Sequence, residues 1–343
     1  MSPIIGKMPM PRTRLRDLRL STRGHGSVYG SPVLEPLKMS HAFPVILFYK
    51  YVSVSDPASF AAEQRNLCTS IGLKGRILIA EEGINGTLAG SAESIDSYVA
   101  ALKKDPRFAD IAFKVSGGDA GTFPKLVVKV RPEIVALNAG EIRPDQDNQL
   151  SPADWRRMMK ENPDAVLLDV RNRFESEAGR FENAVVCDIG HFRELPDYVS
   201  QLGHLKEKTV LMYCTGGIRC EKASALFRAR GFKKVYQLHG GIVTYQEQFR
   251  NEHWQGECFV FDQRMTVKIE EGLVPIGRCA HTSRPTTRFV NCLHDPCHQL
   301  FLLSEEAEQE NKDFLVCPEC FASGLGSATA VYVRPNTAGR SAT

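Results

Sequence analysis

The chain has 343 residues, of which 43% are hydrophobic and 24% charged, and its formal net charge is +3. These values are typical of a soluble globular protein with two or three domains. The sequence contains no run of eighteen or more apolar residues, so it predicts no membrane-spanning helix. The ten cysteines lack the framework of a small secreted protein, which favours the reducing cytoplasm. The small net charge alone neither indicates nor excludes a nucleic-acid partner.

Residues 1–40 are predicted to form a disordered basic extension. They contain seven basic and two acidic residues, with Pro and Gly interspersed and no apolar periodicity. The apolar core of a secretory signal is missing. Two other interpretations stay open: a basic arm that contacts a nucleic-acid backbone, and a true translation start at Met39 rather than Met1.

Residues 41–145 are predicted to form a ferredoxin-like α/β sandwich. A helix over 57–70, capped by Asp56 or Ser55, and a helix near 92–104 alternate with strands over 43–51, 75–80, 86–90 and 125–130. The order β-α-β-β-α-β is the basis of the prediction.

Two details of this domain bear on function. Asn85 and Gly86 indicate a tight turn between the middle strands. Lys125, Lys129 and Arg131 share one strand face, which fits phosphate contacts and a solvated sheet face equally well.

Residues 150–250 are predicted to form a parallel α/β domain. Ser151 caps a helix that begins with Pro152, and strands over 165–170, 184–188, 210–213 and 234–238 alternate with helical stretches.

Ligands of such sheets bind beyond the carboxyl ends of the strands, where Asp169, Arg171 and Cys214 all fall. We interpret Asp169 and Arg171 as an ion pair that fixes a loop, in preference to direct substrate contacts. Cys187 and Cys68 are expected in the hydrophobic cores.

The most informative segment joins a predicted strand to a predicted helix and reads Cys214, Thr215, Gly216, Gly217, Ile218, Arg219 and Cys220. Backbone N–H groups of such a loop form an anion nest, and the helix N-terminus and the Arg219 guanidinium add to its field. Cys214 is therefore predicted to be a thiolate nucleophile, or the carrier of a persulfide anion. Cys220 is either a resolving thiol or a packing residue.

Residues 251–323 form a cysteine-rich region. Gly256–Arg264 is predicted to be a strand in which Cys258 packs. Cys317 and Cys320 have the spacing of a zinc knuckle, and Cys292 and Cys297 are their predicted partners in a structural zinc site. Cys279 or a nearby histidine could replace one ligand, and without metal these are reduced cysteines. Residues 324–343 are predicted to be a disordered tail.

Several of these segments together resemble known proteins. The loop from Cys214, with Asp164–Asn172 and Gly179–Val186, resembles the rhodanese (sulfurtransferase) domain. The sequences of Cys214–Ala223 and Val235–Ile242 indicate a more specific family: they resemble the bacterial tRNA uridine(34) hydroxylases. This resemblance extends over most of 43–320.

This resemblance implies an acylphosphatase-like N-terminal domain and an oxidoreductase that converts wobble uridine of tRNA into 5-hydroxyuridine. It implies that Cys214 is essential, that molecular oxygen is the co-substrate, and that the anticodon loop of tRNA is the partner. No nucleotide cofactor, membrane or obligate protein partner is expected, and the cytoplasm is the expected location.

The role of the sulfur and the rival functions stay open at this level. The Cys214 thiolate either adds to the pyrimidine ring or carries the reactive oxygen as a persulfide or sulfur oxide. The main alternative is a rhodanese-type sulfurtransferase with a persulfide on Cys214. A non-catalytic rhodanese module usually lacks the cysteine. A related phosphatase normally has five residues between Cys and Arg, whereas four, Thr215–Ile218, stand here.

Overall fold

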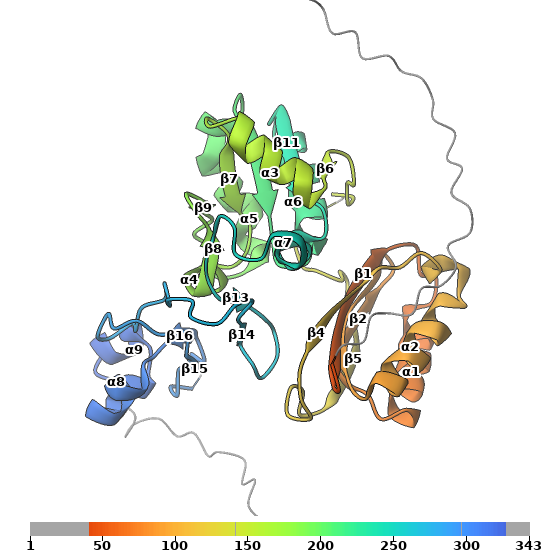
Figure 1. The fold of residues 1–343 in the computed structure, drawn as a ribbon, viewed down its shortest axis with the longest axis horizontal. Coiled ribbons are helices and arrows are strands. Elements are labelled where there is room, and N and C mark those ends of the chain that lie inside the picture. The colour runs from red at the N-terminus through yellow and green to blue at the C-terminus, as the bar shows by residue number, and fades with distance from the viewer. Residues whose placement is uncertain (1–40, 141, 296, 327–343) are drawn as a thin grey trace, which may run out of the picture. The chain divides into compact units, whose positions relative to one another are not determined.

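The computed structural model describes residues 41–140, 142–295 and 297–326 (Figure 1). The predicted basic extension over 1–40 lies outside the described residues, as does the predicted tail beyond its first three positions. In the described part of the chain, no helix is both long and apolar enough to cross a membrane.

The first domain is a five-stranded sheet with two helices on one face (Figure 1). Its elements are β1 (Pro44–Tyr51), α1 (Pro57–Ser70), β2 (Lys74–Ala80), β3 (Gly83–Ala89), α2 (Ala92–Lys103), a 3-10 turn (Pro106–Phe108), β4 (Phe113–Gly117) and β5 (Leu126–Val130). The strand order β4-β1-β3-β2-β5 confirms the predicted ferredoxin-like α/β class.

The assignment of the last strand was wrong in one respect. The fourth strand of the β-α-β-β-α-β unit is β4, which pairs antiparallel with β1. The strand predicted over 125–130 is β5, an additional strand that pairs in parallel with β2 at the opposite edge. β4 was missed although its residues Phe113–Ser116 alternate apolar and polar, because the segment is only five residues long and ends in glycine. So short an alternation is a weaker signal than the apolar run of β5.

The predicted turn at Asn85–Gly86 was also wrong. Ala80 pairs with Gly83, so the turn falls at Glu81–Glu82, and Asn85 and Gly86 lie inside β3. Gly86 is needed because the Phe48 ring lies over it: a Cβ atom there would be 2.4 Å from that ring. A glycine required by close packing gives the same sequence signal as a glycine required by a turn.

The two faces of this sheet have different environments. Asp56 caps α1 by accepting the Ser59 N–H at 2.9 Å, and α1 packs Cys68 into the core as expected. Phe48 on β1 belongs to the same core. Because side chains alternate along a strand, the neighbouring Leu47 and Tyr49 face the other side of the sheet, away from the helices.

The central domain is a parallel sheet with helices on both faces (Figure 1). Its main strands are β6 (Gln149–Leu150), β7 (Val166–Asp169), β9 (Val185–Val186), β10 (Thr209–Tyr213) and β11 (Lys234–Leu238). Its helices are α3 (Pro152–Glu161), α4 (Arg173–Ala178), α5 (Leu195–Tyr198), α6 (Ile218–Ala229) and α7 (Gly241–Phe249), with 3-10 turns at Phe192–Glu194 and Val199–Leu205.

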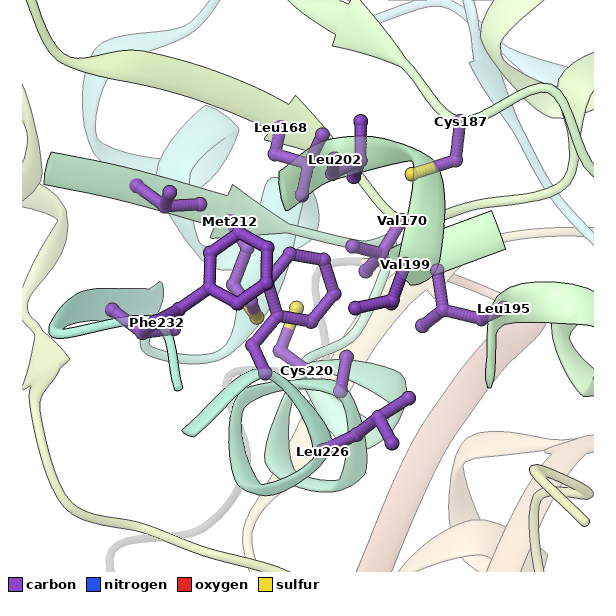
Figure 2. Packing of buried hydrophobic residues seen from close by; sticks show 14 of the residues in the cluster. Leu168, Val170, Cys187, Leu195, Val199, Leu202, Met212, Cys220, Leu226 and Phe232 are labelled. Atoms are coloured by element: carbon purple, nitrogen blue, oxygen red, sulfur yellow. The ribbon is translucent and has the colours of Figure 1, made fainter. Parts of the chain in front are cut away.

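The order β6-β11-β10-β7-β9 has only parallel pairs, as predicted, and only the two-residue edge strand β6 was missed. Figure 2 shows the core on one face, a cluster that includes Met212 of β10, Leu226 of α6 and the buried Cys187 and Cys220. The expected core position of Cys187 is confirmed by its burial.

The C-terminal region consists of small antiparallel pairs and short helices. β12 (Trp254–Gly256) pairs with β8 (Gly179–Phe181), β13 (Cys258–Phe259) with β14 (Thr266–Val267), and β15 (Phe289–Asn291) with β16 (Leu300–Leu302). The helices are α8 (Glu305–Glu310) and α9 (Pro318–Ala322), with a 3-10 turn at Lys312–Leu315. The strand predicted over 256–264 was too long, since the chain turns after Phe259.

Candidate active site at the Cys214 loop

The Cys214 loop joins the carboxyl end of β10 to the start of α6. Gly217 is the N-cap of α6 and has φ +101°, a value that few residues with a side chain adopt. The loop is held from outside by α7, whose Ile242 N–H donates to the Cys214 carbonyl at 3.0 Å and whose Val243 N–H donates to the Thr215 carbonyl at 3.1 Å. Because these two carbonyls point toward α7, the N–H groups on the opposite side of the loop face the Cys214 sulfur.

Cys214 is fully buried, and its sulfur accepts a hydrogen bond from the Gly217 N–H at 3.2 Å. Burial would raise the pKa of this thiol, but the Cys220 thiol, the Arg219 charge and backbone N–H groups outweigh it and lower the pKa to about 5. Burial and the neighbouring Cys214 sulfur raise the pKa of Cys220 well above its usual range. In this geometry Cys214 is the thiolate and Cys220 is a hydrogen-bond donor to it.

Arg219 is held by a residue that the sequence did not single out. Its guanidinium donates to both carboxylate oxygens of Glu175, at 2.5 and 2.7 Å, and Glu175 is fully buried in α4. Thr215 lies in the same network, 3.3 Å from the guanidinium. Glu175 lies in the first turn of α4, where it forms a capping box with Asn172. Its sequence position indicates that capping role but not the ion pair with Arg219, because the pair spans 44 residues.

Asp169 and Arg171 form a fully buried ion pair, with the Arg171 Nη2 2.6 Å from the carboxylate. The same guanidinium donates to the Gly179 carbonyl at 2.6 Å, and Ser176 donates to Asp169 at 2.8 Å. Neither Asp169 nor Arg171 lines the cavity described below. Their contacts are those of a pair that joins β7 to α4 and β8.

The first domain covers the Cys214 loop with side chains from the open face of its sheet. The Lys114 ammonium donates to the Gly216 carbonyl at 2.8 Å, and the Tyr51 hydroxyl donates to the Ile218 carbonyl at 3.1 Å. Burial lowers the pKa of Lys114, and the neighbouring Cys214 sulfur opposes this shift. Sequence reasoning missed Lys114 because it missed β4, the strand that carries it.

Two further contacts join the first domain to α6. The Tyr49 hydroxyl donates to Glu221 at 2.8 Å. The ammonium of Lys222, which is 1% exposed, lies between the carboxylates of Glu82 and Glu133. A lysine is rarely buried unless it is paired, and here two carboxylates of the first domain supply the countercharge.

A cavity of about 760 Å³ lies between the open sheet face of the first domain and the Cys214 loop. Its walls include Leu47 and Lys114 of the first domain, and Thr215, Gly216, Ile218 and Arg219 of the loop. The segment after β13 closes a third side with Phe261 and Arg264. The volume is in the range that holds one small ligand.

Exposed arginines line part of this cavity. Among the residues that the structure describes, no carboxylate lies within ion-pair distance of Arg76, Arg131 or Arg193, and all three are exposed cavity residues. Of the three basic residues predicted on one strand face, Arg131 lines the cavity, whereas Lys125 and Lys129 do not. Unpaired guanidinium groups around a cavity favour an anionic ligand.

The four cysteines predicted to bind zinc come together. The Sγ atoms of Cys292, Cys297, Cys317 and Cys320 all lie within 4.8 Å of one another. Cys297 and Cys317 are 3.7 Å apart, close to the ~3.8 Å edge of a tetrahedron with Zn–S bonds of ~2.3 Å. Cys279 is not part of this group. The donor set and its spacing therefore fit a tetrahedral thiolate site.

Comparisons with known proteins identify the domains. Residues 43–134 match the UPF0176 acylphosphatase like domain, 151–248 the rhodanese-like domain, and 255–321 the rhodanase C-terminal region. A solved rhodanese-like domain from Anabaena is 21% identical, with TM-score 0.28, over 32% of this chain and 80% of that one. The fold and the site define a rhodanese-type protein with an additional domain on either side.

Relatives that match across all three domains identify the family within the rhodanese-type proteins. A tRNA uridine(34) hydroxylase from Shouchella clausii is 42% identical over 82% of this chain and 89% of the relative. One from Bacillus cereus is 42% identical over 78% and 85%. The chain belongs to the tRNA uridine(34) hydroxylase family, as the resemblance of its loop predicted.

We predict that Cys220→Ala raises the pKa of Cys214, because the substitution removes a hydrogen bond that stabilises the thiolate. In the wild type, Cys214 should lose its proton with a midpoint near pH 5. In the variant the midpoint should move to higher pH. Because the sulfur has no exposed surface, the measurement is a pH titration of the Cys214 Cβ chemical shift by NMR, which needs no reagent to reach the thiol. Cys187→Ala is the control, and equal midpoints in all three proteins would contradict the role of Cys220.

Proposed function

We propose that this protein hydroxylates uridine 34 in the anticodon loop of tRNA, with Cys214 as the essential residue and molecular oxygen as co-substrate. The observation that carries the proposal is the cavity in which the thiolate loop and three unpaired arginines lie together. The name of the relatives supplies the substrate. A tRNA substrate also favours the cytoplasm as the place of action.

The residues around the cavity suggest how the substrate is held. Arg76, Arg131 and Arg193 would bind phosphates of the anticodon loop. The target base would leave its stack to enter the cavity, as bases do in enzymes that act on a nucleobase. Replacing the hydrogen on C5 of uracil by hydroxyl oxidises the base by two electrons. With water as the source of the hydroxyl, the step balances if molecular oxygen accepts the two electrons and two protons and leaves as hydrogen peroxide. Cys214 itself is fully buried and is not part of the cavity wall, but Thr215 and Gly216, which follow it in the loop, line the cavity. The proposed thiolate would therefore act on the base from within this loop.

A plain sulfurtransferase with a persulfide on Cys214 is the second candidate. The N–H groups that stabilise the Cys214 thiolate would also stabilise a persulfide anion. However, this activity needs only the central domain, whereas here Lys114 and Tyr51 of the first domain bind the loop itself. The contacts between the domains therefore favour a substrate that needs both.

We also propose a structural zinc ion on Cys292, Cys297, Cys317 and Cys320. Cys292 and Cys297 lie in the connection between β15 and β16, and Cys317 and Cys320 lie at the start of α9. The two segments share a small core. Zinc would join these segments, since so small a core contributes little stability of its own.

The cellular prediction concerns tRNA nucleosides. Cells that lack this protein should lose 5-hydroxyuridine at position 34, and wild-type protein should restore it. Cys214→Ala should not restore it, because no thiolate remains in the loop. Cys187→Ala, which removes a buried core thiol, is the matched control and should restore it. Mass spectrometry of tRNA nucleosides is the measurement. Restoration by Cys214→Ala would refute the proposal, and robust thiosulfate-to-cyanide turnover with unchanged tRNA would favour the sulfurtransferase.

A binding prediction tests the arginines. Alanine at Arg76, Arg131 or Arg193 should weaken binding of an anticodon stem-loop RNA. Each should also lower the slope of log affinity against log salt by roughly 0.7, the value for one lost single-strand phosphate contact. Fluorescence anisotropy at several salt concentrations measures both. Lys125→Ala is the control, since Lys125 is exposed but outside the cavity. A slope lowered equally by Lys125→Ala would indicate a diffuse sheet-face contact instead.

The zinc prediction concerns metal content. The purified protein should carry about one zinc per chain, and Cys317→Ser should lower both the zinc content and the thermal midpoint, because a three-thiolate site binds zinc less tightly. Elemental analysis and calorimetry measure the two effects. Cys279→Ser should keep its zinc, because Cys279 lies outside the four-cysteine group. Full zinc in Cys317→Ser would exclude the proposed ligand set.

A further inference from the structure

Phe261 is a large apolar side chain that the fold leaves open to the cavity. It is 56% exposed and lies among the cavity residues, directly before the buried Asp262. Single exposed apolar residues are common on protein surfaces and need no explanation. The surroundings of this ring, rather than its exposure, are what point to a ligand.

The backbone that carries Phe261 is fixed from both sides. The Val260 N–H donates to the Met265 carbonyl at 2.9 Å, which closes the turn. The Gln263 N–H donates to the Thr122 carbonyl of the first domain at 3.1 Å. The Arg264 guanidinium donates to the Gly117 carbonyl at 2.6 Å. An aromatic ring on so constrained a turn loses little further freedom when a ligand binds.

The ring also has a fixed place beside the Cys214 loop. The guanidinium carbon of Arg219 lies 5.8 Å from the centroid of the Phe261 ring. The Phe259 ring meets it edge-on, with 5.1 Å between centroids. Arg219 is itself held by Glu175. Phe261 is therefore held beside the loop by Arg219, which lies over one face of the ring. A flat ligand would stack on the other face, within the cavity that the loop also lines.

From this arrangement we propose that Phe261 is a stacking platform for a nucleobase, and that the base bound on it is the one presented to the Cys214 loop. This inference rests on the proposed function. A nucleobase offers the flat π-face that an aromatic ring takes up, and its phosphates match the unpaired Arg76, Arg131 and Arg193 of the same cavity. An apolar peptide would match the ring but not the three guanidinium groups.

Binding of two RNAs to the full chain tests the proposal. One is an anticodon stem-loop with uridine at position 34, and the other has an abasic site there. Affinities are measured in oxygen-free buffer, so that no turnover occurs. Base–aromatic stacking contributes ~1–3 kcal/mol, so Phe261→Ala should weaken binding of the uridine RNA roughly 5- to 150-fold. It should change binding of the abasic RNA less than about twofold.

Two further variants separate stacking from apolar contact. Phe261→Trp keeps a π-face and should bind the uridine RNA about as tightly as the wild type. Phe261→Leu keeps an apolar side chain without a π-face and should resemble Phe261→Ala. Thermal midpoints of all variants show that each one is folded. Equal losses on both RNAs, full affinity in Phe261→Leu, or no loss in Phe261→Ala would each overturn the proposal.

The experiments distinguish failure of the proposed function from failure of the stacking proposal. If Cys214→Ala restores 5-hydroxyuridine in cells, the hydroxylation proposal falls whatever Phe261 does in the binding assay. If Cys214 proves essential in cells while Phe261→Ala binds both RNAs normally, only the stacking proposal falls.

Discussion

A negatively charged sulfur without any exposed surface is the constraint on which the rest of this structure depends. Moving a thiolate out of water is costly unless donors replace the lost hydration. Here the donors are the Gly217 N–H, the Cys220 thiol and the charge of Arg219. All three depend on the shape of one short loop. The close packing of α7 against this loop also requires a glycine at Gly241, because a Cβ there would lie 2.5 Å from the Cys214 carbonyl oxygen.

The loop also explains why the first domain is placed over it. Lys114 and Tyr51 bind loop carbonyls, and Glu221 and Lys222 bind residues of the first domain from the first turn of α6. Glu221 and Lys222 belong to the segment Cys214–Ala223, whose sequence resembles this family more specifically than rhodanese domains in general. Their contacts explain the two parts of that segment. Cys214–Arg219 forms the thiolate site, and Glu221 and Lys222 bind the first domain, which completes the cavity.

The sequence predicted what local patterns encode and missed what the fold brings together. The β10–α6 loop, the parallel sheet and the α1 cap follow from short-range signals, and the structure has them. Glu175 and Lys114 gave no such signal, since each acts on a partner 44 or 102 residues away. The turn assigned to Asn85–Gly86 failed because packing against Phe48 and turn formation both require glycine. The role of Phe261 could not be predicted either, since a strand was expected there.

The size of the cavity limits how an RNA could use it. About 760 Å³ holds a single small ligand, not a stem or an ordered loop of several nucleotides. The RNA backbone would therefore stay outside, where the unpaired arginines are exposed, and one base would enter. Unstacking a base costs a few kcal/mol, and less in a single-stranded loop than in a duplex. Stacking on Phe261 would return ~1–3 kcal/mol of that cost inside the cavity. A base in an anticodon loop is already unpaired, so stacking on Phe261 offsets a larger share of its cost than for a base that must first leave a helical stem.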